Sequence, residues 1–348
     1  MANAEHDGNA KYRVLILGGC GFIGRHLADY LVGNNFVSKV RVVDKVPPQI
    51  AWLNKHHQEV FASPLVEFKS ANLINSASCQ NAFADEEGPY DFVVNLAAET
   101  KMGQSDPVYK EGIVKLSVNC AKEAAKQKAK CFIEISSGHV HSSEKTPIKE
   151  SAKPDPWTVM ARFKLQVEEE IPLLVVGAVY KHIGEMMKLL WHKDIKMHTV
   201  HVLDVCRAIW HACLHGKSGE IYHVVDKGNT TQGKISDIVS DIFNINHDYF
   251  GTPMSSLAKM DMSNLVEEIN DKHLGPWAEA CSKDGIENTP LNPYLHQELL
   301  CDKHLNLDGS KFESTGFTYL VPSITKEKVQ EILNDYIAMN IFPRSLVM

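Results

Sequence analysis

Residues 12–44 read YRVLILGGCGFIGRHLADYLVGNNFVSKVRVVD, and this stretch decides the fold. Its first six residues form a short apolar run that is typical of a buried parallel strand. Three glycines spaced three residues apart follow. Apolar residues at helical spacing come next and stop near Gly33, a residue type that favours a helix end. VRVVD then predicts a second strand that ends in Asp44. The order is therefore strand, glycine turn, helix, strand, acid.

The three glycines and the acid have separate roles in this arrangement. Gly18 permits a tight turn, Gly21 lets the backbone approach a pyrophosphate, and Gly24 lets the helix pack against the sheet. The helix N-terminus offers amide groups and the positive end of its dipole to phosphates. Asp44 follows Gly24 by 20 residues, where a carboxylate can bind the adenine ribose hydroxyls and repel a 2′-phosphate. The stretch therefore predicts a site for NAD rather than NADP.

Further motifs follow in order along the chain. VVNLAAET stands at 93–100, ISSGHVH at 135–141 and VHVLDVCRAI at 200–209. With the glycine turn, they make the sequence resemble the extended short-chain dehydrogenase/reductases, the NAD-dependent epimerase/dehydratase family, over most of the chain (12–320). The resemblance implies an α/β fold: a Rossmann doubly wound parallel sheet with a smaller C-terminal substrate-binding part. It also implies NAD as cofactor and a small-molecule substrate, either a nucleotide sugar or a related hydroxylated carbonyl compound.

The resemblance extends the cofactor site beyond the glycine turn. In the family an Asp and an apolar residue follow the third strand and contact adenine. Here these positions are Asn72 and Leu73, so a hydrogen bond can be kept but the charge is lost. Ala97 and Ala98, after the fourth strand, would let the backbone pass close to the cofactor. The full expected set is Gly18, Cys20, Gly21, Phe22, Ile23, Gly24, Asp44, Asn72, Leu73, Ala97, Ala98 and Lys164.

The catalytic set of the family is incomplete in this chain. In the family a Lys binds the nicotinamide ribose and lowers the pKa of a Tyr, the Tyr moves the proton, and a Ser or Thr polarises the substrate oxygen. Ser137 and Lys164 match two of these positions. The Tyr position, four residues before Lys164, is Met160, whose thioether has no proton to transfer.

Other residues could take over the proton transfer. Glu99 follows the fourth strand and is a weak candidate for the base. His139 and His141 have suitable intrinsic pKa values, although we expect both in a surface loop. We expect no metal site. Two main hypotheses stay open: an NAD-dependent enzyme with an atypical acid/base, and a catalytically inactive NAD(H)-binding regulatory or structural protein. A truncated form that folds poorly is the third.

We expect three parts along the chain. Residues 1–11 form a flexible tail, 12–225 the NAD-binding domain and 226–348 the smaller substrate-binding part. The family's strand after the catalytic helix has no clear match. Either VVGAVYK at 175–181 is a degraded version of that segment, or a strand near 171–175 is missing, and we favour the second reading. Further strands are expected at 65–68, 92–96, 131–136 and 221–225, and helices at 108–130, 157–171, 235–243, 257–269 and 326–339.

Composition excludes several classes of protein. A chain of 348 residues with 44% apolar and 23% charged residues is typical of a soluble globular protein. A net charge of −7 argues against a nucleic-acid or anionic-membrane binder, which needs a basic face. No apolar run approaches a membrane span. The eight cysteines form no CxxC pair, which favours reduced thiols in the cytoplasm. The resemblance also implies a homodimer.

Overall fold

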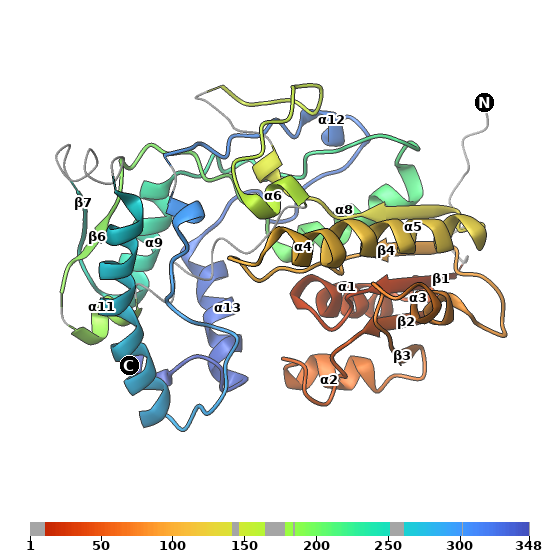
Figure 1. Ribbon diagram of the computed structural model, residues 1–348, viewed down its shortest axis with the longest axis horizontal. Coiled ribbons are helices and arrows are strands. Elements are labelled where there is room, and N and C mark those ends of the chain that lie inside the picture. The colour runs from red at the N-terminus through yellow and green to blue at the C-terminus, as the bar shows by residue number, and fades with distance from the viewer. Residues whose placement is uncertain are drawn as a thin grey trace. The chain divides into compact units, whose positions relative to one another are not determined.

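The computed structural model describes residues 11–140, 146–163, 178–183, 185–250, 261–300 and 302–347 (Figure 1). The chain packs into two compact units. The first unit contains residues 1–136, 202–221 and 314–320. The second unit contains residues 137–201, 222–313 and 321–348.

The first unit is built on a five-stranded parallel sheet. Its strands lie in the order β3-β2-β1-β4-β5. Their bounds are Tyr12–Leu17 for β1, Val37–Asp44 for β2, Val66–Ser70 for β3, Phe92–Asn95 for β4 and Cys131–Glu134 for β5. The strand order reverses between β1 and β4, and in such sheets ligands bind in the crevice beyond the carboxyl ends of the strands at this point. The predicted doubly wound parallel sheet is confirmed.

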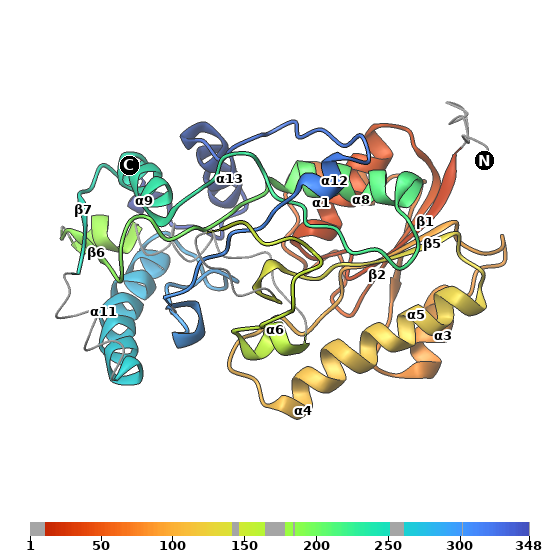
Figure 2. The same ribbon diagram turned by 90° about the horizontal axis from the view of Figure 1, so that it is seen from above.

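Helices cover both faces of this sheet (Figure 2). On one face, α3 (Ser76–Phe83) and α5 (Leu116–Lys126) pack against Leu15, Leu17 and Val43. The other face carries α1 (Phe22–Gly33) and α8 (Val202–His215), with α2 (Lys55–Phe61) beside α1. Trp210 of α8 lies 5.6 Å from the ring of Tyr12 and 5.2 Å from that of Phe36, centroid to centroid. The alternation of side chains along each strand explains the two apolar layers.

The helix expected at 108–130 is interrupted. It begins as α4 (Asp106–Tyr109), widens into a π-helical turn, η1 (Lys110–Lys115), and continues as α5. A π-turn inserts one extra residue into an α-helix and occurs frequently at functional sites. The π-helical turn includes Gly112, whose carbonyl accepts from the Glu99 N–H in the loop after β4, at 3.0 Å.

The second unit contains mainly helices and a small parallel sheet. β6 (Met187–Leu189) pairs with β7 (His247–Tyr249). Leu190, Trp191, Ile195 and Leu265 form a core cluster beside this sheet. The other elements are η2 (Gly138–Val140), α6 (Val159–Phe163), α9 (Gln232–Phe243), α11 (Met262–Lys283), η3 (Gln297–Leu300), α12 (Ser310–Glu313), α13 (Lys326–Ala338) and η4 (Arg344–Leu346). β6 and β7 were not predicted from the sequence, because each has only three residues and they pair across a long stretch of chain.

The prediction of a strand at 221–225 is wrong. This segment has no strand assignment. Residues far away in the sequence contact this segment instead. The His223 N–H donates to Glu150 Oε1 at 2.8 Å, and Gly309 packs against Val225. β-branched apolar residues favour a strand locally, but a strand also needs a neighbouring strand to pair with.

The two units are not separated at residue 225, where the boundary between the NAD-binding domain and the substrate-binding part was predicted from the sequence. The chain leaves the first unit after residue 136, returns for α8, and returns again for residues 314–320. The expected gap at 171–175 lies outside the described residues. Among the helices that the structure describes, none is long and apolar enough to span a membrane.

Candidate active site at the carboxyl edge of the sheet

The glycine turn after β1 is closely packed against the end of β4. Gly18 has φ +76°, a conformation that favours glycine. Its N–H donates to the Val43 carbonyl at 2.7 Å. A Cβ at Gly18 would lie 2.7 Å from the backbone nitrogen of Ala97, and a Cβ at Gly24 would lie 2.5 Å from the Cα of Gly19. Glycine at positions 18 and 24 is therefore required by space.

Gly21 is less tightly packed than Gly18 and Gly24. A Cβ there would meet only the Gly18 carbonyl oxygen, at 3.2 Å. Gly21 is the N-cap of α1, and no side chain of the described residues makes a capping hydrogen bond there. The first amide groups of a helix have no acceptor within the helix, so this turn presents free donors and the positive end of the dipole. The turn has the properties of an anion site.

Asp44 connects the end of β2 to the glycine turn. Its Oδ2 accepts from the Cys20 N–H and its Oδ1 accepts from the Val46 N–H, both at 3.1 Å. Burial, together with the Asp44 charge, raises the pKa of the Cys20 thiol to about 12. Cys20 is therefore a protonated thiol that supports the turn rather than a reactive nucleophile.

Asn72 and Leu73 lie in the loop after β3. The Asn72 side chain accepts from the Ile74 N–H at 3.1 Å and is exposed, whereas Leu73 is buried. Asn119 of α5 fixes this loop by donating from Nδ2 to the carbonyls of Leu73 and Ile74, at 3.1 and 3.0 Å. The loop therefore lies at the same edge as Asp44 with an ordered backbone.

A polar cluster around the buried Asn95 holds Ala97 in place, and no prediction from the sequence included it. Asn95 is fully buried and donates from Nδ2 to Glu134 Oε2 at 2.6 Å and to Ser117 Oγ at 3.2 Å. Because a carboxylate only accepts hydrogen bonds, Asn95 must turn Oδ1 to the Ala97 N–H, 3.2 Å away. The sequence signal that could have identified Asn95 is an amide side chain at the end of an apolar strand.

Glu99 lies four residues beyond β4. Its N–H donates to the Gly112 carbonyl at 3.0 Å, and its Oε1 accepts from the Lys101 N–H at 2.9 Å. A Cβ at Gly112 would lie 2.7 Å from the Cβ of Glu99. Within the first unit, the structure therefore places Ala97 against the glycine turn and Glu99 against Gly112 of η1.

The remaining expected catalytic residues belong to the second unit. Ser137 Oγ accepts from the His139 N–H at 3.3 Å. The expectation that His139 lies on the surface is wrong: it is 3% exposed, and its ring packs against Trp157. Met160, on α6, is 2% exposed. Lys164 and His141 lie outside the described residues. Within the described ranges, no group of three or more His, Cys, Asp or Glu residues could hold a metal ion.

The family comparison agrees with the sheet and the glycine turn. Residues 14–172 match the model of the NAD dependent epimerase/dehydratase family, and this part of the chain belongs to that family. The family is NAD-dependent, as its name states.

Individual proteins with related sequences or folds are similar at lower identity. The bifunctional UDP-glucose 4-epimerase and UDP-xylose 4-epimerase 1 of Pisum sativum is 28% identical over 167 residues, which are 46% of this chain and 47% of that protein. The chain thus aligns with about half the length of this relative. The WbmG enzyme of Bordetella bronchiseptica, solved with NAD and UDP, superposes with a TM-score of 0.66 at 15% identity, covering 97% of this chain and 98% of that one. The dTDP-glucose 4,6-dehydratase of Streptomyces venezuelae, solved with NAD and TYD, has a TM-score of 0.64 at 18% identity, covering 93% and 97%.

Proposed function

We propose that the carboxyl edge of the first unit binds NAD(H). The packing of Gly18 against Ala97 carries this proposal, because it brings the backbone just after β4 against the glycine turn at the switch point of the sheet. The residues fit the cofactor. Gly21 leaves room for a pyrophosphate, the N-terminus of α1 supplies donors, and Asp44 stands where ribose hydroxyls can donate to it. Asp44 also disfavours the extra phosphate of NADP.

We further propose an oxidoreductase of the epimerase/dehydratase type, acting on a nucleotide sugar or a related hydroxylated carbonyl compound. Bound NAD supplies a hydride acceptor. The names of the similar proteins, which contain UDP- and dTDP-sugars, support this substrate class. The part of the chain beyond residue 225 would supply substrate contacts. A homodimer in the cytoplasm is also proposed.

The acid/base of this proposed enzyme differs from that of the family. Met160 stands at the usual Tyr position and cannot move a proton. Ser137 would polarise the substrate oxygen and Lys164 would bind the nicotinamide ribose. Glu99 is the candidate that remains for proton transfer, because it follows β4 at the same edge as the glycine turn.

A second candidate function is favoured by the burial of Met160. At 2% exposure, its side chain is part of the packing of α6. In this alternative the chain holds NAD(H) without turnover, as a regulatory or structural protein. It binds the cofactor with measurable affinity, and no nucleotide sugar is converted.

A thermal-melt titration with NAD⁺, NADH and NADP⁺ tests the cofactor proposal. A ligand at about 100 times its Kd adds roughly 2.7 kcal/mol, which should raise the melting temperature by several degrees. Gly21→Asp should abolish the shift. Gly21 has φ −70°, which any residue adopts, and a Cβ there would meet only the Gly18 carbonyl oxygen, at 3.2 Å. The variant places a negative charge where the pyrophosphate would lie.

The matched control is Gly275→Asp, since a Cβ at Gly275 would meet no atom within 4 Å. This variant should keep the full shift with NAD(H). A sharp melt that neither NAD⁺ nor NADH moves would contradict the proposal. Once binding is established, a panel of nucleotide sugars separates the two candidate functions by the presence or absence of conversion.

A further inference from the structure

β4 lies on the other side of β1 from β2, the strand that ends in Asp44. A dinucleotide crosses such a sheet at the switch point, with each nucleotide over one half. Asp44, at the end of β2, lies on the half expected to bind the adenosine. The nicotinamide half then lies over β4 and β5, and Glu99 follows β4 on that side.

The backbone around Glu99 is fixed by the helix that contains the π-turn. The Glu99 N–H donates to the Gly112 carbonyl at 3.0 Å. Tyr109, which is 2% exposed, donates from its hydroxyl to the Lys101 carbonyl at 3.0 Å and accepts from the Gln104 N–H at 3.2 Å. These bonds tie residues 99–104 to α4 and η1 at both ends.

The Glu99 side chain is fixed as well. Its Oε1 accepts from the Lys101 N–H at 2.9 Å, which restricts the carboxylate to one side of the loop. The missing Cβ of Gly112 makes room for it, because a Cβ there would lie 2.7 Å from the Cβ of Glu99. Glycine inside a helix is unfavourable by about 1 kcal/mol relative to alanine, so a gain in packing has to offset it.

From this geometry we infer that Glu99, positioned by Gly112 of the π-turn, makes the bound cofactor prefer its oxidised form. The inference rests on the proposed binding of NAD(H). The nicotinamide ring of NAD⁺ carries a positive charge and that of NADH carries none. A fixed carboxylate on the nicotinamide side therefore attracts NAD⁺ and leaves NADH almost unaffected. Gly112 is a positioning residue, since it acts through Glu99.

The ratio of the two dissociation constants measures this effect. We expect Glu99→Gln to weaken the binding of NAD⁺ relative to NADH about threefold, the size of a partly exposed charge interaction. Isothermal titration of the full chain with each form of the cofactor gives both constants. The matched control is Glu111→Gln, which removes an exposed carboxylate from the same π-turn, where it pairs with Lys115. That variant should keep the wild-type ratio.

Gly112→Ala tests the positioning. We expect it to lower the melting temperature and to shift the NAD⁺/NADH ratio in the same direction as Glu99→Gln. Adding Glu99→Gly removes the atom that the alanine would meet, so the double variant should regain the melting temperature but not the ratio. Gly275→Ala, in α11, is the control for the general effect of alanine in a helix.

Three results would each overturn a different part of the inference. Equal ratios in the wild type and Glu99→Gln would remove the role of Glu99 and leave NAD(H) binding intact. A Gly112→Ala protein with wild-type melting temperature and ratio would remove the role of the π-turn. Absence of binding of both NAD⁺ and NADH to the wild type would overturn the proposed function and this inference together.

Discussion

Met160 is the residue whose replacement tests the proposed chemistry most directly. It lies on α6, four residues before Lys164, where the family has a Tyr. A thioether neither donates nor accepts a proton at neutral pH, whereas a phenol with a lowered pKa does both. The side chain is buried, so a larger ring must be accommodated by its neighbours.

We expect Met160→Tyr to raise the rate of NAD reduction or of sugar epimerisation on a panel of nucleotide sugars. General acid–base catalysis contributes on the order of 10²-fold or more, so a gain of tenfold is a conservative threshold. Met160→Phe, which adds the ring without the hydroxyl, is the control and should not gain activity. A folded Tyr variant with no gain would favour the alternative without turnover.

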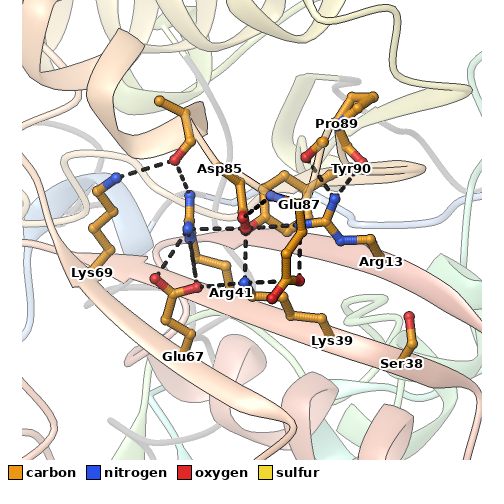
Figure 3. A network of polar contacts seen from close by, with 12 residues as sticks. Arg13, Ser38, Lys39, Arg41, Glu67, Lys69, Asp85, Glu87, Pro89 and Tyr90 are labelled. Carbon is orange, nitrogen blue, oxygen red and sulfur yellow. Dashed lines mark hydrogen bonds and ion pairs between the residues drawn. The ribbon is translucent and has the colours of Figure 1, made fainter.

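At the scale of elements, cationic side chains of β1 and β2 contact acidic residues of β3 and of the loop between α3 and β4 (Figure 3). Arg41 of β2 contacts Glu67 of β3 and Asp85, both at 3.0 Å. Lys39 and Arg13 reach Asp85 at 2.9 and 2.8 Å. The Asp85 side chain is only 4% exposed, so its charge depends on these partners. The network fixes the loop between α3 and β4 to the sheet.

The pKa values follow from this burial and pairing. Burial alone would raise the pKa of Asp85, but hydrogen bonds from Tyr90 and Lys39 and the nearby Arg41 hold it well below its usual range. The pKa of Glu67 is also lowered, since its bonds to Arg41 and Lys39 outweigh burial. Carboxylates with a depressed pKa stabilise the fold above their unfolded pKa of about 4, and this contribution is lost as the pH falls toward the folded pKa.

We therefore expect Asp85→Asn to lower the free energy of unfolding by about 3 kcal/mol at pH 7, because it removes the nearly buried negative charge that Arg41, Lys39 and Arg13 share. The difference from wild type should shrink as the pH is lowered below about 4. Urea unfolding at neutral and acid pH measures both effects. Glu331→Gln, in an exposed pair with Lys328, should change the midpoint little. A difference between Asp85→Asn and wild type that is independent of pH would contradict this account.

At the scale of the whole molecule, each unit is assembled from distant parts of the chain. In the first unit, α8 holds the late segment 314–320. Asp204 Oδ1 accepts from the Leu320 N–H at 2.8 Å, and Arg207 donates to the Thr318 carbonyl at 2.8 Å. The side chains of His211 and Thr315 also form a hydrogen bond, with Nε2 and Oγ1 2.8 Å apart. Asp204 and Arg207 of the VHVLDVCRAI motif therefore have a structural role within the unit proposed to bind NAD(H).

Hydrogen exchange should reveal which unit responds to the cofactor. We expect NAD⁺ to slow exchange at residues 18–24 and 96–99 of the first unit, because the ligand would cover the glycine turn and the end of β4. Peptides from α13 serve as the internal reference. Gly21→Asp should show no ligand-dependent change. Protection restricted to the second unit would place the ligand elsewhere.

The local part of the candidate site was predictable from the sequence. β1, the glycine turn, α1 and β2 lie within 33 consecutive residues, and each is encoded by short-range signals: an apolar run, glycine spacing and helical periodicity. The expected strands at 92–96 and 131–136 and the helix at 326–339 were also found to within two residues at each end.

The tertiary structure alone decided the features that depend on contacts between distant residues. The 221–225 segment has strand-forming residues but pairs with no strand in the part of the chain that the structure describes, and β6 and β7 pair across about 60 residues. Asn95 is oriented by Glu134, and Glu99 fits only because position 112 is glycine. Periodicity and residue type encode local conformation, whereas pairing, burial and close approach depend on which segments meet in space. The sequence by itself thus determined a parallel nucleotide-binding sheet, and the tertiary structure decided what surrounds its carboxyl edge.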